Sequence, residues 1–286
     1  MDIGRREVLK AGAVTAATAA VRGDQSSAPG GLEILPSKLS NPSETARRAR
    51  LALGNIATNP NNTTVTVMSG NLAGGRKDRI WQGPQDQTKT IELIKRWSPQ
   101  ICFFQEVHLE RLATLYQEFG KVALAPNDSH PTRGDFGNMF VIQEGLDIIN
   151  HSRIQLPDSG LVTGRNAATI TLDVNGIALR VLGTHFSPEA SIRYQQIRSV
   201  RRTIDREGID LAIGDFNQDL SSVQASLVAR RQAHLSAPAT MPSWKPRTAA
   251  DGAIPISRRV TSLGQLTTHP IESDHLAVLE QFKIAV

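Results

Sequence analysis

The sequence predicts a mixed α/β fold that contains both parallel and antiparallel strands. Short apolar runs rich in β-branched residues alternate along the chain with segments of helical periodicity, as is typical of an α/β protein. Two of the apolar runs are separated by Asn175-Gly176, the sequence of a tight hairpin turn, so at least one pair of neighbouring strands is antiparallel. A mixed sheet is therefore favoured over a purely parallel, doubly wound one.

Each apolar, β-branched run is interpreted as one strand. In chain order these runs are 64–68, 101–104, 138–142, 168–174, 178–184, 211–213 and 276–282. Helices are predicted over 88–98, where Ile91, Ile94 and Trp97 share one face, and over 189–206, which has the same spacing of apolar residues. The arginines of the second helix, Arg193, Arg198, Arg201 and Arg202, are more typical of a solvated helix face than of a phosphate track.

The N-terminus is interpreted separately from the fold. Residues 1–20 resemble a twin-arginine export signal, because Arg5-Arg6 precedes an alanine-rich stretch with small residues at 17–19 for cleavage. The uncharged run 11–21 is shorter than the roughly 20 residues that a bilayer-spanning helix needs. We therefore expect export to the periplasm or the extracellular space. Residues 21–62 are expected to form a linker and a lead-in segment, and 63–286 a folded domain.

Composition limits the class of protein. The chain has 286 residues, of which 40% are apolar and 21% charged, as in soluble globular proteins rather than disordered or membrane ones. The net charge of +5 suits an anionic partner such as nucleic acid or lipid headgroups, although it could equally serve solubility. The single Cys102 excludes an intramolecular disulfide and is expected to be a small buried hydrophobe.

Polar residues suited to metal or phosphate chemistry stand at the ends of several predicted strands. They are Asn71, Gln105, Glu106, His185, Asp215 and Asn217, which follow apolar runs, and Asp274 and His275, which precede the last one. Glu106 follows four apolar residues, so its ionised form needs compensation by a cation or by several hydrogen-bond donors. Glu106, Asp274 and Asn71 offer the oxygen ligands that suit Mg²⁺ or Ca²⁺, and no HExxH or paired CxxC pattern offers a zinc site.

These residue types fit phosphodiester hydrolysis. That reaction needs the phosphate charge neutralised, a water deprotonated and a leaving alkoxide stabilised or protonated. His185 and His275 can exchange protons near neutral pH, and Asp215 and Asn217 can orient a water and a phosphate oxygen together.

The ordered series GNL, QE, GTHF, GDFN and SDH resembles the endonuclease/exonuclease/phosphatase superfamily of DNase I-like, metal-dependent phosphohydrolases. The resemblance extends from Asn71 to His275. It implies a four-layer α/β/β/α sandwich with two mixed β-sheets and a cleft at one end of the sheets. It also implies Mg²⁺, or Mn²⁺ or Ca²⁺, and no organic cofactor.

The resemblance further implies roles for individual residues. Glu106 would hold the metal, with Asn71 and Asp274 beside it. In the catalytic group His275 would be the general base, Asp251 would orient its imidazole, Asp215 and Asn217 would position nucleophile and phosphate, and His185 would stabilise the transition state or protonate the leaving group. One departure stands out, because relatives often carry a carboxylate that supports the first histidine, and segment 160–168 offers only Thr163, Arg165 and Asn166.

Substrate class is less sharply indicated. The basic charge, the arginine-rich helix and the export signal favour a nuclease acting on DNA or RNA. A phospholipid or other small phosphoester is the alternative substrate, but the polar loop 127–137 lacks the apolar surface of a membrane-entering enzyme. Trp244 either packs or borders the cleft as a stacking surface. A binding module without turnover is a third possibility, against which Asp215, Asn217 and His275 are all retained.

Overall fold

The computed structural model describes residues 33–35, 62–72, 76–77, 80–81, 88–108, 121–126, 136–143, 145–158, 165–228, 237–270 and 273–285. The expected export signal, the linker at 22–31 and most of the loop 127–137 lie outside these ranges. Within the expected lead-in segment, Glu33–Leu35 forms strand β1. No helix in the described ranges has the length and apolar character needed to cross a membrane.

The larger sheet has seven strands in the order β1, β6, β7, β5, β2, β14, β13. Their bounds are Glu33–Leu35, Lys121–Pro126, Phe136–Ile142, Ile101–His108, Asn62–Asn71, Leu276–Ala285 and Val260–Pro270, in that order. β2 and β5 are parallel, and all other neighbours are antiparallel. β3 (Arg76–Lys77) and β4 (Ile80–Trp81) form a separate two-stranded antiparallel sheet.

The smaller sheet has five strands in the order β12, β11, β10, β9, β8. Their bounds are Asp251–Pro255, Leu211–Asp215, Ile177–His185, Asn166–Val174 and Asp147–Gln155, in that order. β10 and β11 are parallel and the other pairs antiparallel, so both sheets are mixed. Asn175 and Gly176 form the β9–β10 turn with φ of 56° and 82°, which confirms the predicted hairpin.

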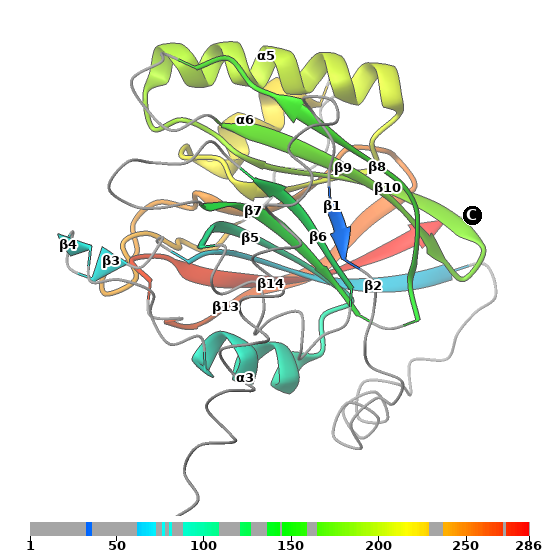
Figure 1. Ribbon diagram of the computed structural model, residues 1–286, viewed down its shortest axis with the longest axis horizontal. Coiled ribbons are helices and arrows are strands. Elements are labelled where there is room, and N and C mark those ends of the chain that lie inside the picture. The colour runs from blue at the N-terminus through cyan, green and yellow to red at the C-terminus, as the bar shows by residue number, and fades with distance from the viewer. Residues whose placement is uncertain are drawn as a thin grey trace, which may run out of the picture.

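Helices cover the outer faces of the two sheets (Figure 1). α3 (Thr88–Trp97) packs Ile94 against the seven-stranded sheet, in a cluster with Met68 and Phe104. α5 (Ala190–Glu207) and α6 (Leu220–Leu227) pack Val200 and Val223 against the five-stranded sheet. This arrangement is the expected four-layer α/β/β/α sandwich.

Apolar side chains fill the space between the sheets. Phe103 and Phe140 from the larger sheet have ring centroids 4.6 Å apart and belong to one buried cluster with Val181 and Ile213 from the smaller sheet. Burying side chains of this size contributes roughly 1.5–3 kcal/mol each. The two sheets are therefore held face to face, and the strand ends at one edge of the sandwich stay in fixed positions relative to each other.

Every strand predicted from an apolar run is present, as are both predicted helices. Cys102 is fully buried, and burial raises the pKa of its thiol, as befits a core residue. None of the predicted apolar runs covers β1, β3, β4, β6, β8, β12 or β13, and α6 was not predicted. Their sequences are short or polar, or, as in β6, contain few β-branched residues.

Candidate active site

Strand register brings the predicted polar residues of the smaller sheet side by side. His185 at the end of β10 is paired with Asp215 at the end of β11, and Asp215 is paired with Asp251 at the start of β12. The close approach of β10 and β11 depends on Gly214, because a Cβ there would lie 1.9 Å from the Thr184 carbonyl oxygen. The glycine of the GDFN motif therefore allows His185 and Asp215 to meet.

Asp215 is the centre of the site. Its Oδ2 accepts a hydrogen bond of 3.0 Å from Asn71 Nδ2, which comes from the end of β2 in the other sheet. The same oxygen lies 3.3 Å from His185 Nε2 and 4.0 Å from His275 Nε2. Burial alone would raise the pKa of Asp215, but the charges of His275 and His185, together with hydrogen bonds from His185 and Asn71, hold it well below its usual range. Asp215 is thus an ionised carboxylate to which both sheets contribute partners.

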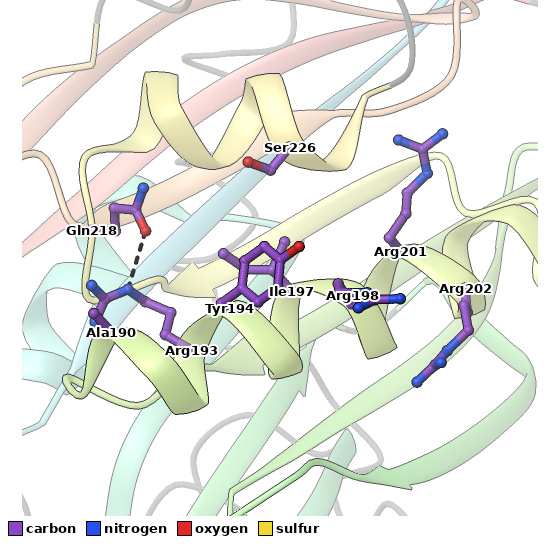
Figure 2. Close-up of a pocket in the computed structure, with 9 residues that line it drawn as sticks. All are labelled: Ala190, Arg193, Tyr194, Ile197, Arg198, Arg201, Arg202, Gln218 and Ser226. Carbon is purple, nitrogen blue, oxygen red and sulfur yellow. Dashed lines mark hydrogen bonds between the residues drawn. The ribbon is translucent and has the colours of Figure 1, made fainter.

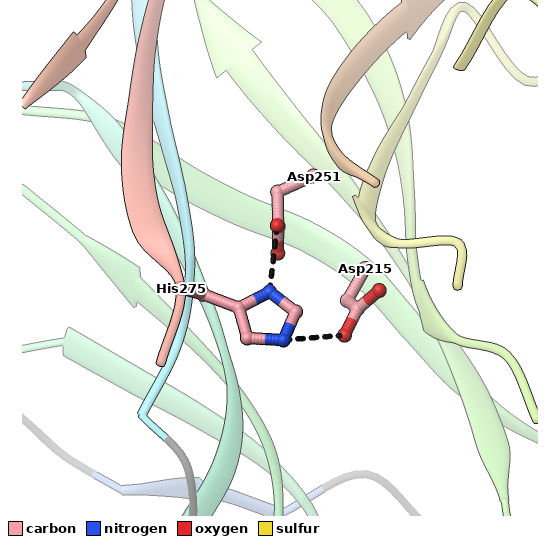
Figure 3. A group of neighbouring side chains, drawn as sticks. All are labelled: Asp215, Asp251 and His275. Carbon is pink, nitrogen blue, oxygen red and sulfur yellow. Dashed lines mark hydrogen bonds and ion pairs between the residues drawn. The ribbon is translucent and has the colours of Figure 1, made fainter. Parts of the chain in front are cut away.

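His275 is held between two carboxylates (Figure 3). Its Nδ1 lies 2.8 Å from Asp251 Oδ2, and its Nε2 faces Asp215. Thr240 Oγ1 donates to the same Asp251 oxygen at 2.7 Å. Burial disfavours the imidazolium of His275, but the charges of Asp251 and Asp215 outweigh it and raise its pKa to about 10. Asp251 thus lies where the sequence placed the orienting carboxylate, and Thr240 fixes it there.

His185 has no carboxylate from the segment 160–168, and Arg165 lies against its ring instead. Arg165 Nη1 approaches both ring nitrogens, at 2.7 Å from Nε2. The acidic neighbour of His185 is Asp215, which it shares with His275. In place of the carboxylate that relatives often carry on segment 160–168, His185 therefore has the carboxylate of Asp215, which it shares with His275, and the buried Arg165.

Asn217 adopts the left-handed conformation that asparagine tolerates better than most residues, with φ of 48°. Its backbone N–H donates to Asp215 Oδ1 at 2.8 Å, and its Nδ2 donates to the Phe186 carbonyl at 2.9 Å. These bonds tie the turn after β11 to the turn after β10. They keep the Asn217 amide beside the central carboxylate.

Glu106 lies in a β-bulge of β5, where pairing with β7 shifts register between Phe104 and Val107. Its φ is 54°, unfavourable for a glutamate, and its side chain is half-buried. The preceding Gln105 is paired with Asn71 across the parallel β5 and β2. A bulge at this point re-aims a side chain at the end of the strand.

Asp274 lies on the open side of the site. Its side chain is 49% exposed, and its Oδ1 is 4.0 Å from His275 Nε2. The loop that carries Trp244 is attached here, because Ser243 N donates to the Asp274 carbonyl at 2.7 Å and Ser243 Oγ to the Ser273 carbonyl at 2.7 Å. Trp244 is 72% exposed, so its ring is a free apolar surface beside the site.

Two sets of residues have donors suited to a cation. Among the described residues, ligand atoms of Asp215, Asp251 and His275 lie within 4.8 Å of one another, but the imidazole of His275 already bridges these two carboxylates. Glu106 and Asp274, with hard oxygen donors and access to water, fit Mg²⁺ better than the buried trio does.

Thr240 and Arg165 are site residues that the motifs did not reveal. Thr240 contacts Asp251 across 11 positions of sequence, and Arg165 contacts His185 across 20. Arg165 lies in segment 160–168, where the expected partner of His185 was a carboxylate rather than an arginine. Nothing in the sequence around Thr240 marks it.

The fold and the strand-end cluster together define a phosphoesterase of the DNase I-like class. A model of the endonuclease/exonuclease/phosphatase family matches residues 68–275, and the chain belongs to this family, whose members hydrolyse phosphoester bonds. No curated protein sequence matches the chain.

Solved structures share the fold at low sequence identity. The human Nocturnin catalytic domain with a bound sulfate anion is 20% identical, with a TM-score of 0.58, over 77% of this chain and 94% of that one. D. rerio TDP2 in complex with a single-strand DNA product is 13% identical, with a TM-score of 0.56, over 77% and 98%. A mannosyl-6-phosphatase from Bacteroides thetaiotaomicron is 13% identical, with a TM-score of 0.57, over 76% and 99%. The same sandwich therefore occurs in proteins whose names indicate different phosphoester substrates.

Proposed function

We propose that this protein is a divalent-cation-dependent phosphodiester hydrolase whose substrate is DNA or RNA. The observation that carries the proposal is the convergence of Asn71, His185, Asp215, Asp251 and His275 at one end of the two sheets. Such a group can bind a phosphate, hold a water and move a proton within a few ångströms.

Each side chain of the cluster has a role in this proposal. His275 accepts the proton of the attacking water at Nε2, while Asp251 holds Nδ1–H and keeps the imidazole in one orientation. Asp215 and Asn217 position the water and the phosphate from the turn after β11. His185 stabilises the charge that develops on the phosphate oxygens or protonates the leaving alkoxide.

Glu106, Asp274 and Asn71 are the residues proposed to hold the cation. A divalent ion held there would neutralise charge on the phosphate oxygens, and its positive charge would lower the pKa of the neighbouring His275. His275 needs that shift, because its pKa is otherwise about 10 and a protonated imidazole cannot act as a base. Mg²⁺ fits this oxygen set, and Mn²⁺ or Ca²⁺ are the alternatives.

Nucleic acid is favoured over other phosphoesters on charge and surface. The net charge is +5, and the exposed Trp244 beside Asp274 offers a face on which a base can stack. Nocturnin and TDP2 share the fold, although the mannosyl-6-phosphatase shares it equally well. A phospholipid or small phosphoester is therefore the second candidate substrate.

The proposal is tested by incubating the protein with supercoiled plasmid, single-stranded RNA, sphingomyelin vesicles and a sugar phosphate, each with Mg²⁺ and with EDTA. We expect Mg²⁺-dependent cleavage of DNA or RNA that His275→Ala abolishes. The matched control is His151→Ala, since His151 lies in edge strand β8, away from the cluster. Turnover of vesicles or sugar phosphate alone would exclude nuclease activity, and folded protein that cleaves nothing would indicate a binding module.

We also propose that the protein is exported through its twin-arginine segment and acts outside the cytoplasm. Arg5-Arg6 and the small residues at 17–19 support this proposal. Export of a folded protein is compatible with a chain that has one cysteine and binds its cation before it leaves the cytoplasm.

A further inference from the structure

A surface groove lies between α5 and α6, on the outer face of the smaller sheet (Figure 2). Its volume is about 710 Å³. It is lined by Ala190, Arg193, Tyr194, Ile197, Arg198, Arg201, Arg202, Gln218 and Ser226, none of which is acidic. Four arginines around one concave, partly apolar surface suit an anion that also carries apolar or aromatic groups.

The groove begins beside the active site. α5 follows His185 at the end of β10, and α6 follows Asp215 at the end of β11, so both helices start at the active-site edge and run away from it. Gln218, which lines the groove, directly follows Asn217 and accepts a hydrogen bond of 3.1 Å from Arg193 Nε. A chain molecule whose phosphate lies at Asp215 can therefore continue into the groove without crossing the core.

The arginines of the groove differ in their interaction partners. Arg193 donates to the carbonyls of Ser187 and Pro188, and Arg201 is paired with Asp205 at 3.0 Å. Among the described residues, no carboxylate lies within ion-pair distance of Arg198 or Arg202. The guanidinium of Arg198 lies 5.9 Å from the ring centroid of Tyr194, and Tyr194 is 62% exposed. The unneutralised charge is thus next to an exposed aromatic ring.

Tyr194, Arg198 and Arg202 form one row along α5. They are spaced four residues apart, so each step rises about 6 Å along the helix axis, and all three side chains are exposed. An aromatic face for stacking and cations for the backbone are the two elements of surfaces that bind single-stranded nucleic acid. A duplex fits this row poorly, because its bases are stacked inside and cannot reach the Tyr194 ring.

We propose that the groove between α5 and α6 binds the single-stranded part of a polynucleotide next to the phosphate that is cleaved. Tyr194 stacks on a base, and Arg198 and Arg202 contact successive phosphates. This inference rests on the proposed nuclease function, which it deepens by assigning a strand-binding surface outside the catalytic cluster.

Binding is measured by fluorescence anisotropy of a fluorescein-labelled 20-nucleotide oligothymidylate and the matching oligouridylate, in EDTA to prevent cleavage. We expect the double variant Arg198→Ser/Arg202→Ser to bind about tenfold more weakly than wild type. We also expect its slope of log affinity against log salt to be less steep by about 1.4, the value for two phosphates of a single strand. Tyr194→Ala is expected to weaken binding without changing that slope. Arg258→Ser, an exposed arginine in the turn between β12 and β13, is the control and is expected to bind as wild type does.

Hydrolysis of bis(4-nitrophenyl) phosphate separates the two proposals. This small diester can occupy the active site but is too short to extend from there into the groove. The groove variants are expected to keep the wild-type rate on it and to show a raised KM on RNA or DNA. If wild type cleaves nucleic acid but the double variant binds and cleaves it equally well, the groove proposal is overturned and the nuclease function stands. If wild type neither binds the oligonucleotides nor cleaves nucleic acid, both proposals are overturned.

Discussion

Replacing Glu280 by glutamine is expected to stabilise the protein at neutral and alkaline pH. Glu280 lies in β14, is 1% exposed and faces the smaller sheet, where its Oε1 accepts a hydrogen bond of 2.6 Å from Ala253 N in β12. Its other oxygen, Oε2, is buried and has no hydrogen-bond partner among the described residues. Burial therefore raises the pKa of Glu280 to about 8, against an ordinary value of 4.5.

The sign and size of the effect follow from proton linkage. The folded state keeps its proton up to about pH 8, whereas the unfolded state loses it near 4.5, so the free energy of unfolding falls as the pH rises through this window. Over this window the titration of Glu280 lowers the free energy of unfolding by at most roughly 5 kcal/mol. Glu280→Gln keeps the acceptor for Ala253 N and cannot ionise, so it lacks this loss.

The assay is urea unfolding of wild type and Glu280→Gln, followed by circular dichroism at intervals from pH 4 to pH 9. When the unfolding free energy of wild type is subtracted from that of the variant, the contributions of the other titrating groups cancel, because both proteins contain them. It should grow by several kcal/mol in favour of the variant between pH 4.5 and 8 and level off above that. A difference that does not change with pH would refute the reasoning, whatever its absolute size.

Three further perturbations have defined outcomes. Gly214→Ala should prevent close pairing of β10 and β11 and destabilise the fold by more than 3 kcal/mol on urea unfolding, since the added Cβ meets a backbone oxygen at 1.9 Å. Burial alone would raise the pKa of Asp210, but bonds from Arg259, Arg180 N and Ser257 hold it below its usual range, and Arg259→Met removes the charged partner among these. We expect a loss of about 3 kcal/mol on urea unfolding at pH 7 that shrinks as the pH falls and Asp210 protonates. Lysines in place of Arg5-Arg6 should retain the protein in the cytoplasmic fraction of an exporting host, and unchanged export would contradict the signal assignment.

Much of the site could be predicted because strands were easy to recognise. Apolar runs placed the ends of β2, β10 and β11, and Asn71, His185 and Asp215 lie within three residues after those runs. The structure brings all three together through hydrogen bonds and short contacts. Adjacency along the chain was sufficient here, because each side chain belongs to the strand whose end it occupies.

Contacts between distant segments could not be predicted in the same way. The carboxylate expected beside His185 is replaced by Arg165, and the oxygen of Asp251 is fixed by Thr240. Glu280 and Gln281 are adjacent polar residues in one strand, but only the structure shows that Glu280 faces the other sheet and is buried. Residue type and spacing give the alternation of faces in a strand, whereas the packing of the two sheets decides which face is buried.

The central claim is that the ionised carboxylate of Asp215 is the core of a phosphodiester-hydrolysing site. It is tested most directly by the rate of bis(4-nitrophenyl) phosphate hydrolysis, with Mg²⁺, by Asp215→Asn and Asp219→Asn. Asp219 caps α6 through a bond to Ser221 N that asparagine can also make, so it is a matched control four residues away. We predict that Asp215→Asn lowers kcat/KM about 100-fold or more while Asp219→Asn stays within twofold of wild type. Equal rates for the two variants would contradict the proposed active site.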